Sequence, residues 1–353
     1  MALIELKNLS IRGVASCVPK NETSNIDYNY ISQTERDLFI KTTGIAKRRV
    51  APQHISTGDL LYSAAKELLN SLKWSNDEVD AIITITQSPD YFIPGTAVML
   101  QNKLSLKKTT IAFDVNLGCS GYVYGLFIAG NLMQSGNIKK VILCVGDKSS
   151  SSTCEQDKST YPLFGDAGSA TAIEYDSDAK ESYFNLMTDG SGHEAIMISD
   201  GGSRNGIRKE TFELKEVAPG VIRAGRHLQL NGVEIFNFAV REVPNAIKEL
   251  YEFAGKLLEN TDYFVLHQAN KFINESVRKK MKSVPAEKFL YSIESFGNTS
   301  SASIPLTMTE NFKNIENGKT NELCLCGFGV GFSWGACIVN AEKTVFLPLI
   351  EIE

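Results

Sequence analysis

The chain has 353 residues, of which 43% are hydrophobic and 22% charged, which fits one large or two fused medium-sized globular domains. Its formal net charge of −5 argues against a nucleic-acid-binding protein, because such proteins normally present a basic face. No apolar run approaches the roughly 20 residues that span a bilayer, and the N-terminal "MALIELKNLSIRG" lacks the apolar region of a signal peptide. We therefore expect a cytoplasmic protein without a membrane span.

Three strand-like segments of the first half recur in the second half at similar spacing. "VDAIITITQSPD" (79–90) resembles "TDYFVLHQANKF" (261–272), with an acidic residue, a β-branched run and a polar turn. "TTIAFDVNLGCSG" then matches "FLYSIESFGNTSS" as a following strand, and "KKVILCVGDKSS" matches "NELCLCGFGVGF". Amphipathic segments such as 60–72 and 274–284 lie between the strands, which is typical of α/β proteins. The pattern predicts a duplicated α/β unit.

The duplication brings three polar turns into correspondence. Under this alignment Cys119 falls beside Asn298, and the turn after "ITITQ" matches the turn that holds His267. Duplicated halves usually pack about a pseudo-twofold axis, and pockets commonly form at such junctions. We therefore expect Cys119, His267 and Asn298 to converge where the halves meet.

Cys119 has the setting of a nucleophile. It lies in "NLGCSGYV", just before the apolar helical segment "SGYVYGLFIAGNLM". The unpaired N–H groups and the dipole at a helix N-terminus favour a thiolate. Gly118 and Gly121 permit a tight turn and the close approach of a substrate. The alternative is a buried structural cysteine.

His267 and Asn298 have weaker individual signals. His267 ends the apolar strand "YFVLHQAN", and active sites of α/β sheets lie at strand ends, but a core histidine would also fit. Asn298 lies in "FGNTSSASIP", which could equally be a turn followed by a helix cap.

The remaining cysteines and glycines do not indicate a metal or phosphate site. Seven cysteines at irregular spacing form no disulfide framework, and Cys324 and Cys326 are expected to be buried thiols on one face of a strand. With four histidines in the chain, we expect no metal. The glycine-rich segments 164–175 and 326–335 match neither a Walker A loop nor a dinucleotide fingerprint.

Taken together, the segments resemble β-ketoacyl-acyl carrier protein synthase III of the thiolase-like superfamily. The matches run in order through "TGIAKRRVA", "FDVNLGCSGYVYGL", "FGDAGSA", "NGVEIFNFAV", "LHQAN", "GNTSSASIP" and "GFSWG". The resemblance implies a five-layered αβαβα fold built from two similar halves, which we place at 1–176 and 177–353, and a homodimer. It implies an acyltransferase of fatty acid or related acyl-chain biosynthesis. A specialised condensing enzyme of secondary metabolism or surface-polymer assembly is the alternative.

The resemblance also implies roles for individual residues. Cys119 would take an acyl group from a coenzyme A or carrier-protein thioester, and no further cofactor would be needed. His267 and Asn298 would stabilise the enolate formed when malonyl-acyl carrier protein loses carbon dioxide. The backbone N–H groups of Cys119 and Val330 would form the oxyanion hole. The acidic carrier protein would dock on basic residues after "HQAN", for which the candidates are Lys271, Arg278, Lys279 and Lys280.

The chain departs from the family pattern at several positions. Leu38 and Thr42 stand where the family usually has the tryptophan and arginine that hold the adenine of coenzyme A. Phe272 and Asn237 replace basic residues, and Val330 replaces the middle glycine of a triple glycine. The tail "AEKTVFLPLIEIE" extends beyond the usual end. These departures favour a specialised member whose donor is a carrier-protein thioester.

Three other protein classes fit less well. A papain-like protease has the same Cys, His, Asn order, but expects tryptophan after the cysteine, where this chain has Ser120. A hydroxymethylglutaryl-coenzyme A synthase needs a carboxylate base, and Asn298 stands at the matching position. A silent binding module would not need to retain Cys119, His267 and Asn298.

Overall fold

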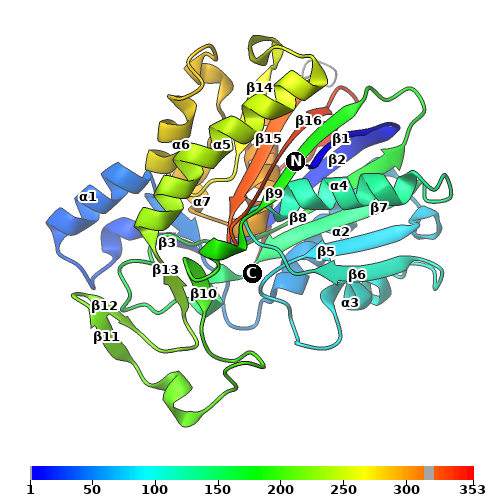
Figure 1. Ribbon diagram of the computed structural model, residues 1–353. Coiled ribbons are helices and arrows are strands. Elements are labelled where there is room, and N and C mark those ends of the chain that lie inside the picture. Colours follow the sequence, from blue (N-terminus) through cyan, green and yellow to red (C-terminus); the bar gives the residue numbers. More distant parts are fainter. Residues whose placement is uncertain (1, 314–321) are drawn as a thin grey trace.

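A computed structural model describes residues 2–313 and 322–353; Met1 and residues 314–321, which fall inside the two predicted halves, lie outside the described residues. The strands of the first sheet are β2 (Leu9–Pro19), β5 (Ala81–Ile85), β6 (Ile111–Val115), β7 (Lys140–Asp147), β8 (Ala167–Tyr175), β17 (Val345–Phe346) and β18 (Ile350–Ile352). The strands of the second sheet are β1 (Ala2–Leu6), β9 (Ser182–Thr188), β14 (Tyr263–Leu266), β15 (Glu322–Gly329) and β16 (Ser333–Asn340). Figure 1 shows strands of both sheets.

Helices separate and cover the two sheets. The longer helices are α1 (Gln33–Thr43), α2 (Thr57–Leu72), α3 (Thr96–Lys103), α4 (Gly121–Met133), α5 (Gly232–Ala254), α6 (Lys271–Arg278) and α8 (Ser303–Phe312), and α7 (Ile293–Phe296) is a single turn. Three short strand pairs lie outside the two sheets, namely β3 (Glu22–Ser24) with β4 (Lys47–Arg49), β10 (Ile196–Ile198) with β13 (Leu228–Leu230), and β11 (Lys215–Ala218) with β12 (Val221–Arg223).

The hydrophobic cores define five layers. One core joins α4 and α8 to the facing sides of both sheets. A second core joins α5 and α6 to the outer face of the second sheet, and a third joins α2 and α3 to the outer face of the first. The order is therefore α2/α3, sheet, α4/α8, sheet, α5/α6, which confirms the predicted αβαβα fold (Figure 1).

The two sheets repeat one strand order. In the first sheet β5 runs parallel to β7, β7 antiparallel to β8, and β8 antiparallel to β2. In the second sheet β14, β15, β16 and β9 pair in the same order and with the same directions. The helices α4 and α8 occupy corresponding places between them. The internal duplication inferred from the sequence is thus visible in the topology.

One predicted strand is wrong. The segment "FLYSIESFGNTSS" makes two isolated parallel bridges, Phe289 with Phe264 and Asn298 with Phe164, and forms the single turn α7 between them. Its counterpart in the first half is the full strand β6. The helical turn α7 interrupts the extended pattern, and Gly297, with a φ of 66°, ends that turn.

The chain termini cross between the halves. The first strand, β1, pairs with β9 in the second sheet, while β17 and β18 at the other end of the chain pair with β2 in the first sheet. The tail that the sequence marked as an extension is therefore part of a sheet, with Leu347 buried in the core beside α2. The division at 176/177 stays a prediction, and the terminal strands lie across it.

Two further expectations concern the burial of Cys324 and Cys326 and the membrane-spanning helices. Cys324 and Cys326 are fully buried on β15, so the prediction of core thiols is confirmed. Across residues 2–313 and 322–353, none of the helices has the length and apolar character needed to cross a bilayer.

Candidate active site

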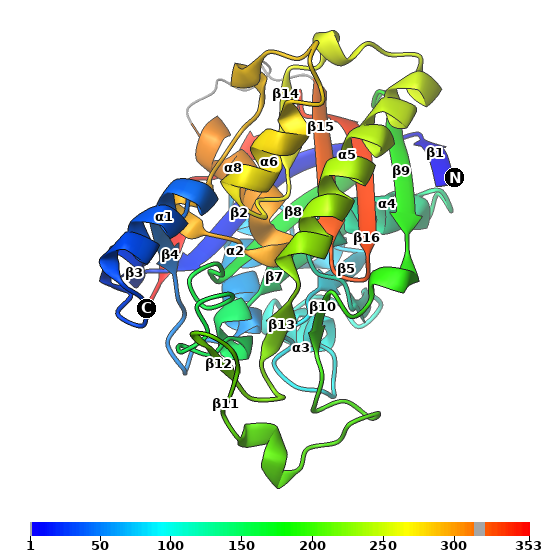
Figure 2. The same ribbon diagram turned by 60° about the vertical axis from the view of Figure 1, so that its left-hand side comes forward.

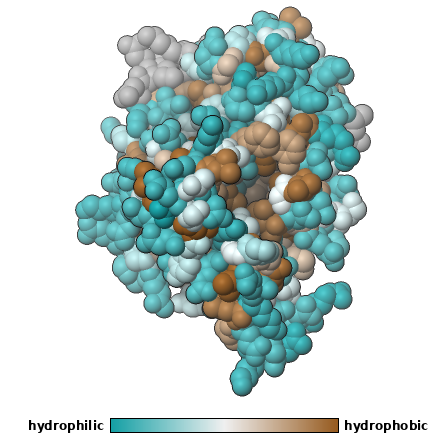
Figure 3. Space-filling model, turned by 90° about the vertical axis from the view of Figure 1, so that its left-hand side faces the viewer, coloured by the Kyte–Doolittle hydropathy of each residue, from teal (hydrophilic) through white to brown (hydrophobic). Residues whose placement is uncertain are grey.

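A pocket of about 320 Å³ lies where strand ends of the two sheets meet. Cys119, His267 and Asn298 all line it, so the structure brings the three predicted residues together. Its walls combine Cys119 and Asp147 from the first half with residues from the second half. The apolar lining comes mainly from side chains of β10, β13, α5 and β15, among them Ile196, Ile198, Leu228, Leu230, Ile235 and Phe328. In the space-filling view of Figure 3, brown side chains surround a hollow near the middle of the face.

Cys119 lies two residues before the first residue of α4 and is 7% exposed. Its position follows from the burial of α4, since both sheets pack on this helix and leave its N-terminus at the strand ends. Two glycines make room around the turn. A Cβ on Gly121 would lie 2.6 Å from the Ile85 side chain, and a Cβ on Gly329 would lie 2.8 Å from the Cys119 sulfur. The glycines thus allow protein neighbours to approach the cysteine closely.

The environment of Cys119 keeps its thiol protonated at neutral pH. Burial raises the pKa of Cys119 to about 11, and the negative charge of Asp147 acts in the same direction. The backbone N–H of Val330 and the Ser300 hydroxyl lower the pKa, but they do not overcome burial. The helix N-terminus, from which the sequence suggested a thiolate, is therefore not the dominant influence on the resting thiol.

His267 directly follows β14 and is 1% exposed. Its Nδ1 lies 2.7 Å from the Ser303 hydroxyl at the start of α8. The backbone N–H of His267 donates to the Cys326 carbonyl at 2.8 Å, which continues the pairing of the two strands past the end of β14. Burial lowers the pKa of His267 to about 3, and a hydrogen bond with the Ser300 backbone only partly opposes this effect. The imidazole is therefore neutral across the physiological range.

Asn298 is held by backbone contacts from both sides. Its N–H donates to the Leu163 carbonyl at 2.9 Å, and its own carbonyl accepts from the Gly165 N–H at 3.0 Å. Its side-chain Oδ1 accepts a hydrogen bond from the Ser300 N–H at 2.9 Å. Because this contact occupies the oxygen, the amide Nδ2 is the side of Asn298 that remains as a donor, with one long contact of 3.5 Å to the Ala269 carbonyl.

Val330 also lines the pocket, and its backbone N–H points at the sulfur closely enough to affect the thiol pKa. This is the position that the resemblance assigned to the oxyanion hole.

Three polar residues at this site were not predicted from the sequence. Ser303 contacts His267, Ser300 lies between the Cys119 and Asn298 turns, and Asp147 lies at the end of β7. Both serines are in the "GNTSSASIP" segment, where they could also have been turn or cap residues. An acidic residue that ends a buried apolar strand, as Asp147 does in "VILCVGD", was the available signal.

The four basic candidates for carrier-protein docking differ in exposure and in their ion pairs. Lys271, Lys279 and Lys280 are exposed on and just after α6. The guanidinium of Arg278 instead makes a two-pronged ion pair with Glu275, with N···O distances of 3.0 and 2.7 Å. Lys280 shares a surface depression with three basic residues that the sequence did not single out, namely Arg241, Lys248 and Lys282.

Apolar side chains stand near α1 and α6 on the same side of the molecule. Phe272, which is 53% exposed, stacks on Phe236 with ring centroids 5.1 Å apart. Leu38 on α1 is 62% exposed. Figure 2 shows α1 outside the layers, beside α6.

Comparison with known proteins identifies the family. The model described as 3-oxoacyl-[acyl-carrier-protein (ACP)] synthase III matches residues 113–190, and the model of its C-terminal part matches residues 252–341. The β-ketoacyl-[acyl-carrier-protein] synthase III of Acholeplasma laidlawii (strain PG-8A) is 35% identical over 339 residues, covering 95% of this chain and 100% of the relative. That of Fusobacterium nucleatum is 31% identical, covering 95% and 99%.

Solved structures agree with the sequence relatives. A crystal structure of a 3-oxoacyl-(acyl-carrier protein) synthase from Burkholderia xenovorans LB400 superposes with a TM-score of 0.91 and 34% identity, covering 99% of both chains. The chain belongs to the 3-oxoacyl-[acyl-carrier-protein] synthase III family, within the thiolase-like superfamily.

Proposed function

We propose that Cys119, His267 and Asn298 are the catalytic residues with which this chain condenses an acyl group with malonyl-acyl carrier protein. The family reaction is a decarboxylating condensation of fatty acid synthesis, and the enzyme is an acyltransferase that acts on thioesters. The observation that supports the assignment is the convergence of these three side chains, one from each of three separate turns, in one largely apolar pocket.

In the first half-reaction, the Cys119 sulfur attacks the carbonyl carbon of an acyl thioester. The carbonyl oxygen becomes an oxyanion, which the N–H groups of Cys119 and Val330 stabilise. The bond to the departing thiol then breaks, and that thiol leaves with the proton that Cys119 gives up. The acyl chain lies against apolar pocket walls such as Ile196, Leu228 and Phe328.

In the second half-reaction, malonyl-acyl carrier protein loses carbon dioxide and leaves an enolate. His267 Nε2–H and Asn298 Nδ2–H donate to the thioester oxygen, on which negative charge develops. Donors aimed at developing charge are typically worth about 3 kcal/mol each. The enolate carbon attacks the acyl-Cys119 carbonyl, the carbon–sulfur bond breaks, and β-ketoacyl-acyl carrier protein forms while the sulfur recovers a proton.

The tautomer of His267 determines whether it can act as this donor. The Ser303 oxygen is also 3.4 Å from the Gln268 N–H, so Ser303 can accept there and give its own proton to Nδ1 of His267. The ring then carries its single proton on Nε2, the nitrogen assigned to the enolate. Because the pKa of His267 is lowered to about 3, the imidazole stays neutral above pH 5 and keeps this donor role.

We also propose a homodimer in the cytoplasm. In the first sheet β6 is an edge strand, and Ile111 at its start is 40% exposed. Phe92 and Ile93, which follow β5, are 89% and 86% exposed. An unpaired edge beside large exposed apolar side chains is well suited to a second copy of the chain. All seven cysteines, each in the described part, are unpaired, as expected in a reducing compartment.

The first prediction concerns the resting thiol. Because the pKa of Cys119 is raised to about 11, the reactive thiolate fraction should increase about tenfold for each pH unit between 7 and 9. Alkylation of Cys119 by iodoacetamide, followed by peptide mass, should show this slope without a plateau. A plateau below pH 8 would show a thiolate at rest, with Cys119→Ser as the control for labelling elsewhere.

The second prediction separates the two half-reactions. His267→Ala and Asn298→Ala should retain detectable self-acylation of Cys119, since that step relies on backbone donors, and should lower release of carbon dioxide from labelled malonyl-acyl carrier protein by about 100-fold or more. Cys119→Ser should lose self-acylation. Carbon dioxide release near the parental rate in either alanine variant would remove that residue from the role.

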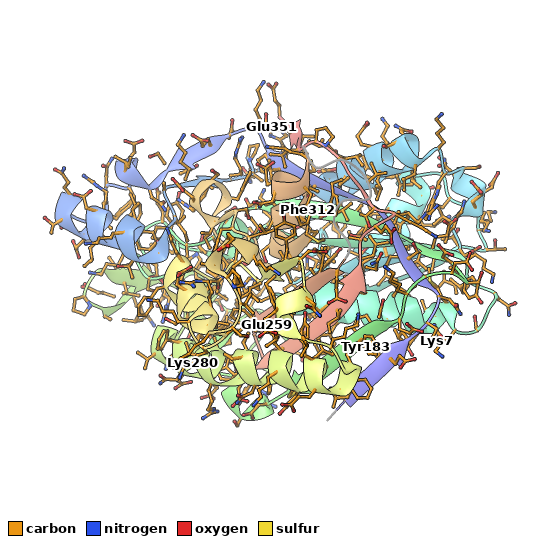
Figure 4. The ribbon with its side chains drawn as sticks, turned by 90° about the horizontal axis from the view of Figure 1, so that it is seen from above. Lys7, Tyr183, Glu259, Lys280, Phe312 and Glu351 are labelled. Carbon is orange, nitrogen blue, oxygen red and sulfur yellow. The ribbon has the colours of Figure 1, made fainter. Side chains whose placement is uncertain are left out.

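The third prediction tests the docking patch. Charge reversal of Lys279 and Lys280 to Glu should raise the KM for malonyl-acyl carrier protein at low salt and leave acylation by a small thioester unchanged, because electrostatic docking acts mainly on association. Lys7→Glu is the matched control; Figure 4 shows Lys7 and Lys280 on opposite sides of the molecule. An unchanged KM in the double reversal excludes this patch.

The fourth prediction concerns the donor. Leu38 offers no aromatic face and Thr42 no guanidinium plane, and stacking contacts of that kind are worth about 1–3 kcal/mol. An acyl-carrier protein should therefore load Cys119 at least as fast as the matching acyl-coenzyme A. Tyr161 is not a free replacement, since its ring stacks on Tyr28 and faces Arg48. A strong preference for the coenzyme A ester, with tight binding of free coenzyme A, contradicts this.

The fifth prediction concerns assembly. Sedimentation equilibrium at micromolar concentration should give about twice the chain mass of 38.8 kDa. Phe92→Asp combined with Ile93→Asp should shift the protein toward the monomer. Leu257→Asp, which changes an exposed apolar residue elsewhere on the surface, should not. A monomeric parent protein would refute the proposed dimer.

A further inference from the structure

A buried carboxylate beside the pocket has no part in the reaction steps described above. Asp147 ends β7 in the first half and is 2% exposed. Among the described residues that line the pocket, it is the only carboxylate. A buried carboxylate is costly unless its oxygens are fully hydrogen-bonded, so its partners indicate what it holds in place.

Both oxygens of Asp147 are surrounded by donors. Oδ1 accepts from the Gln87 N–H at 2.7 Å, from the Thr86 hydroxyl at 3.1 Å and, at 3.4 Å, from the Ser88 hydroxyl. Oδ2 accepts from the Ser301 hydroxyl at 2.8 Å and from the Ser301 N–H at 3.2 Å. Burial raises the pKa of Asp147, and the hydrogen bonds from Gln87 and Ser301 act against this effect. The backbone N–H groups can only donate, so both carboxyl oxygens act as acceptors. No Lys or Arg of the described residues forms an ion pair with it.

The Ser301 contact joins Asp147 to the turn that carries Asn298. Ser300, between them, has a φ of 50°, in the left-handed region that residues with a Cβ rarely adopt. Such a conformation persists only where the surrounding contacts hold it. The N–H of this same Ser300 donates to Asn298 Oδ1 and so turns the amide Nδ2 toward the pocket. Asp147 holds the next residue, Ser301, through two hydrogen bonds, and the Ser300 hydroxyl also donates to Asp147.

The other oxygen joins the turn after β5. Thr86, Gln87 and Ser88 follow the last residue of β5, and Gln87 and Ser88 line the pocket. The Gln87 side-chain oxygen would lie 2.4 Å from a Cβ on Gly118, which directly precedes Cys119. One carboxylate therefore ties a turn beside the nucleophile to the turn that orients the enolate donor.

We propose that Asp147 is a positioning residue that, through Ser301, holds the strained 298–301 turn and thereby aims the Asn298 amide for the decarboxylation step. The inference rests on the proposed role of Asn298. It assigns to Asp147 no contact with substrate and no proton transfer.

The test measures condensation and thiol reactivity in the same variants. Asp147→Asn keeps the shape but replaces an acceptor oxygen with an NH₂ group that faces donors. We expect kcat for condensation to fall at least tenfold with little change in the KM for malonyl-acyl carrier protein. Alkylation of Cys119 at pH 8 should be no slower than in the parent, because the negative charge that raises the pKa of Cys119 is removed. General loss of structure would also lower kcat, but it would expose Cys119 and speed its alkylation. An unchanged circular dichroism spectrum and melting temperature therefore show that the variant is folded.

A double-mutant cycle tests the route through Ser301. Ser301→Ala should lower kcat less than Asp147→Asn, and the double variant should lie within about twofold of Asp147→Asn alone, because the two residues share one path. Multiplicative losses would show that Asp147 acts elsewhere and would overturn the proposal. Asp80→Asn is the control: this carboxylate also accepts from two backbone N–H groups, of Lys139 and Lys140, at the opposite end of β5.

These variants distinguish failure of the positioning role of Asp147 from failure of the catalytic role of Asn298. If Asn298→Ala keeps its carbon dioxide release, the role of Asn298 is wrong, whatever Asp147 does. If Asn298→Ala loses it and Asp147→Asn does not, Asn298 stands and the positioning role falls. Should Asp147→Asn fail to fold, Ser301→Ala decides alone: lower kcat with normal alkylation supports the proposal, and unchanged kcat overturns it.

Discussion

The site depends on the burial of two helices, α4 and α8, between two sheets. Residues of α4 such as Tyr122, Leu126 and Met133 are fully buried, and the helix is apolar nearly all round because sheets cover both sides of it. A helix confined in this way can place its N-terminus only at the strand ends. Cys119 precedes one of these helices and Asn298 precedes the other, so the packing that builds the core also brings the two turns together.

The chemical properties of Cys119 and His267 follow from their burial in this pocket. Burial keeps the His267 imidazole neutral and the Cys119 thiol protonated, and it makes each fixed donor near them more effective. A neutral imidazole with one N–H can donate a hydrogen bond to an enolate oxygen. Asp147 is the exception in this pocket, a buried carboxylate that also raises the pKa of the Cys119 thiol. Its donors explain how it is accommodated, and its link to Ser301 gives a structural reason for its presence.

The sequence could predict the fold and the convergence of Cys119, His267 and Asn298 in one pocket because both leave patterns along the chain. The repeated strand segments carry the duplication, and "NLGCSG", "LHQAN" and "GNTSSASIP" carry the family resemblance. It could not predict the irregular 289–299 segment, whose apolar run looks like a strand although residues 293–296 form the helical turn α7. Arg278 seemed as free as its lysine neighbours, because its ion pair with Glu275 depends on side-chain geometry. Asp147 and Ser301 are 154 residues apart, so their contact exists only in the folded chain.

The central claim is that Cys119 carries the acyl group that the enolate attacks. The most direct measurement incubates the protein with a panel of acyl-coenzyme A and acyl-carrier donors, reads the adduct by intact and peptide mass spectrometry, and then adds malonyl-acyl carrier protein. The account predicts one acyl group on the peptide containing Cys119, which disappears on the chase as an equal amount of β-ketoacyl-acyl carrier protein forms. An acyl group on another residue, or an adduct on Cys119 that survives the chase, would contradict it.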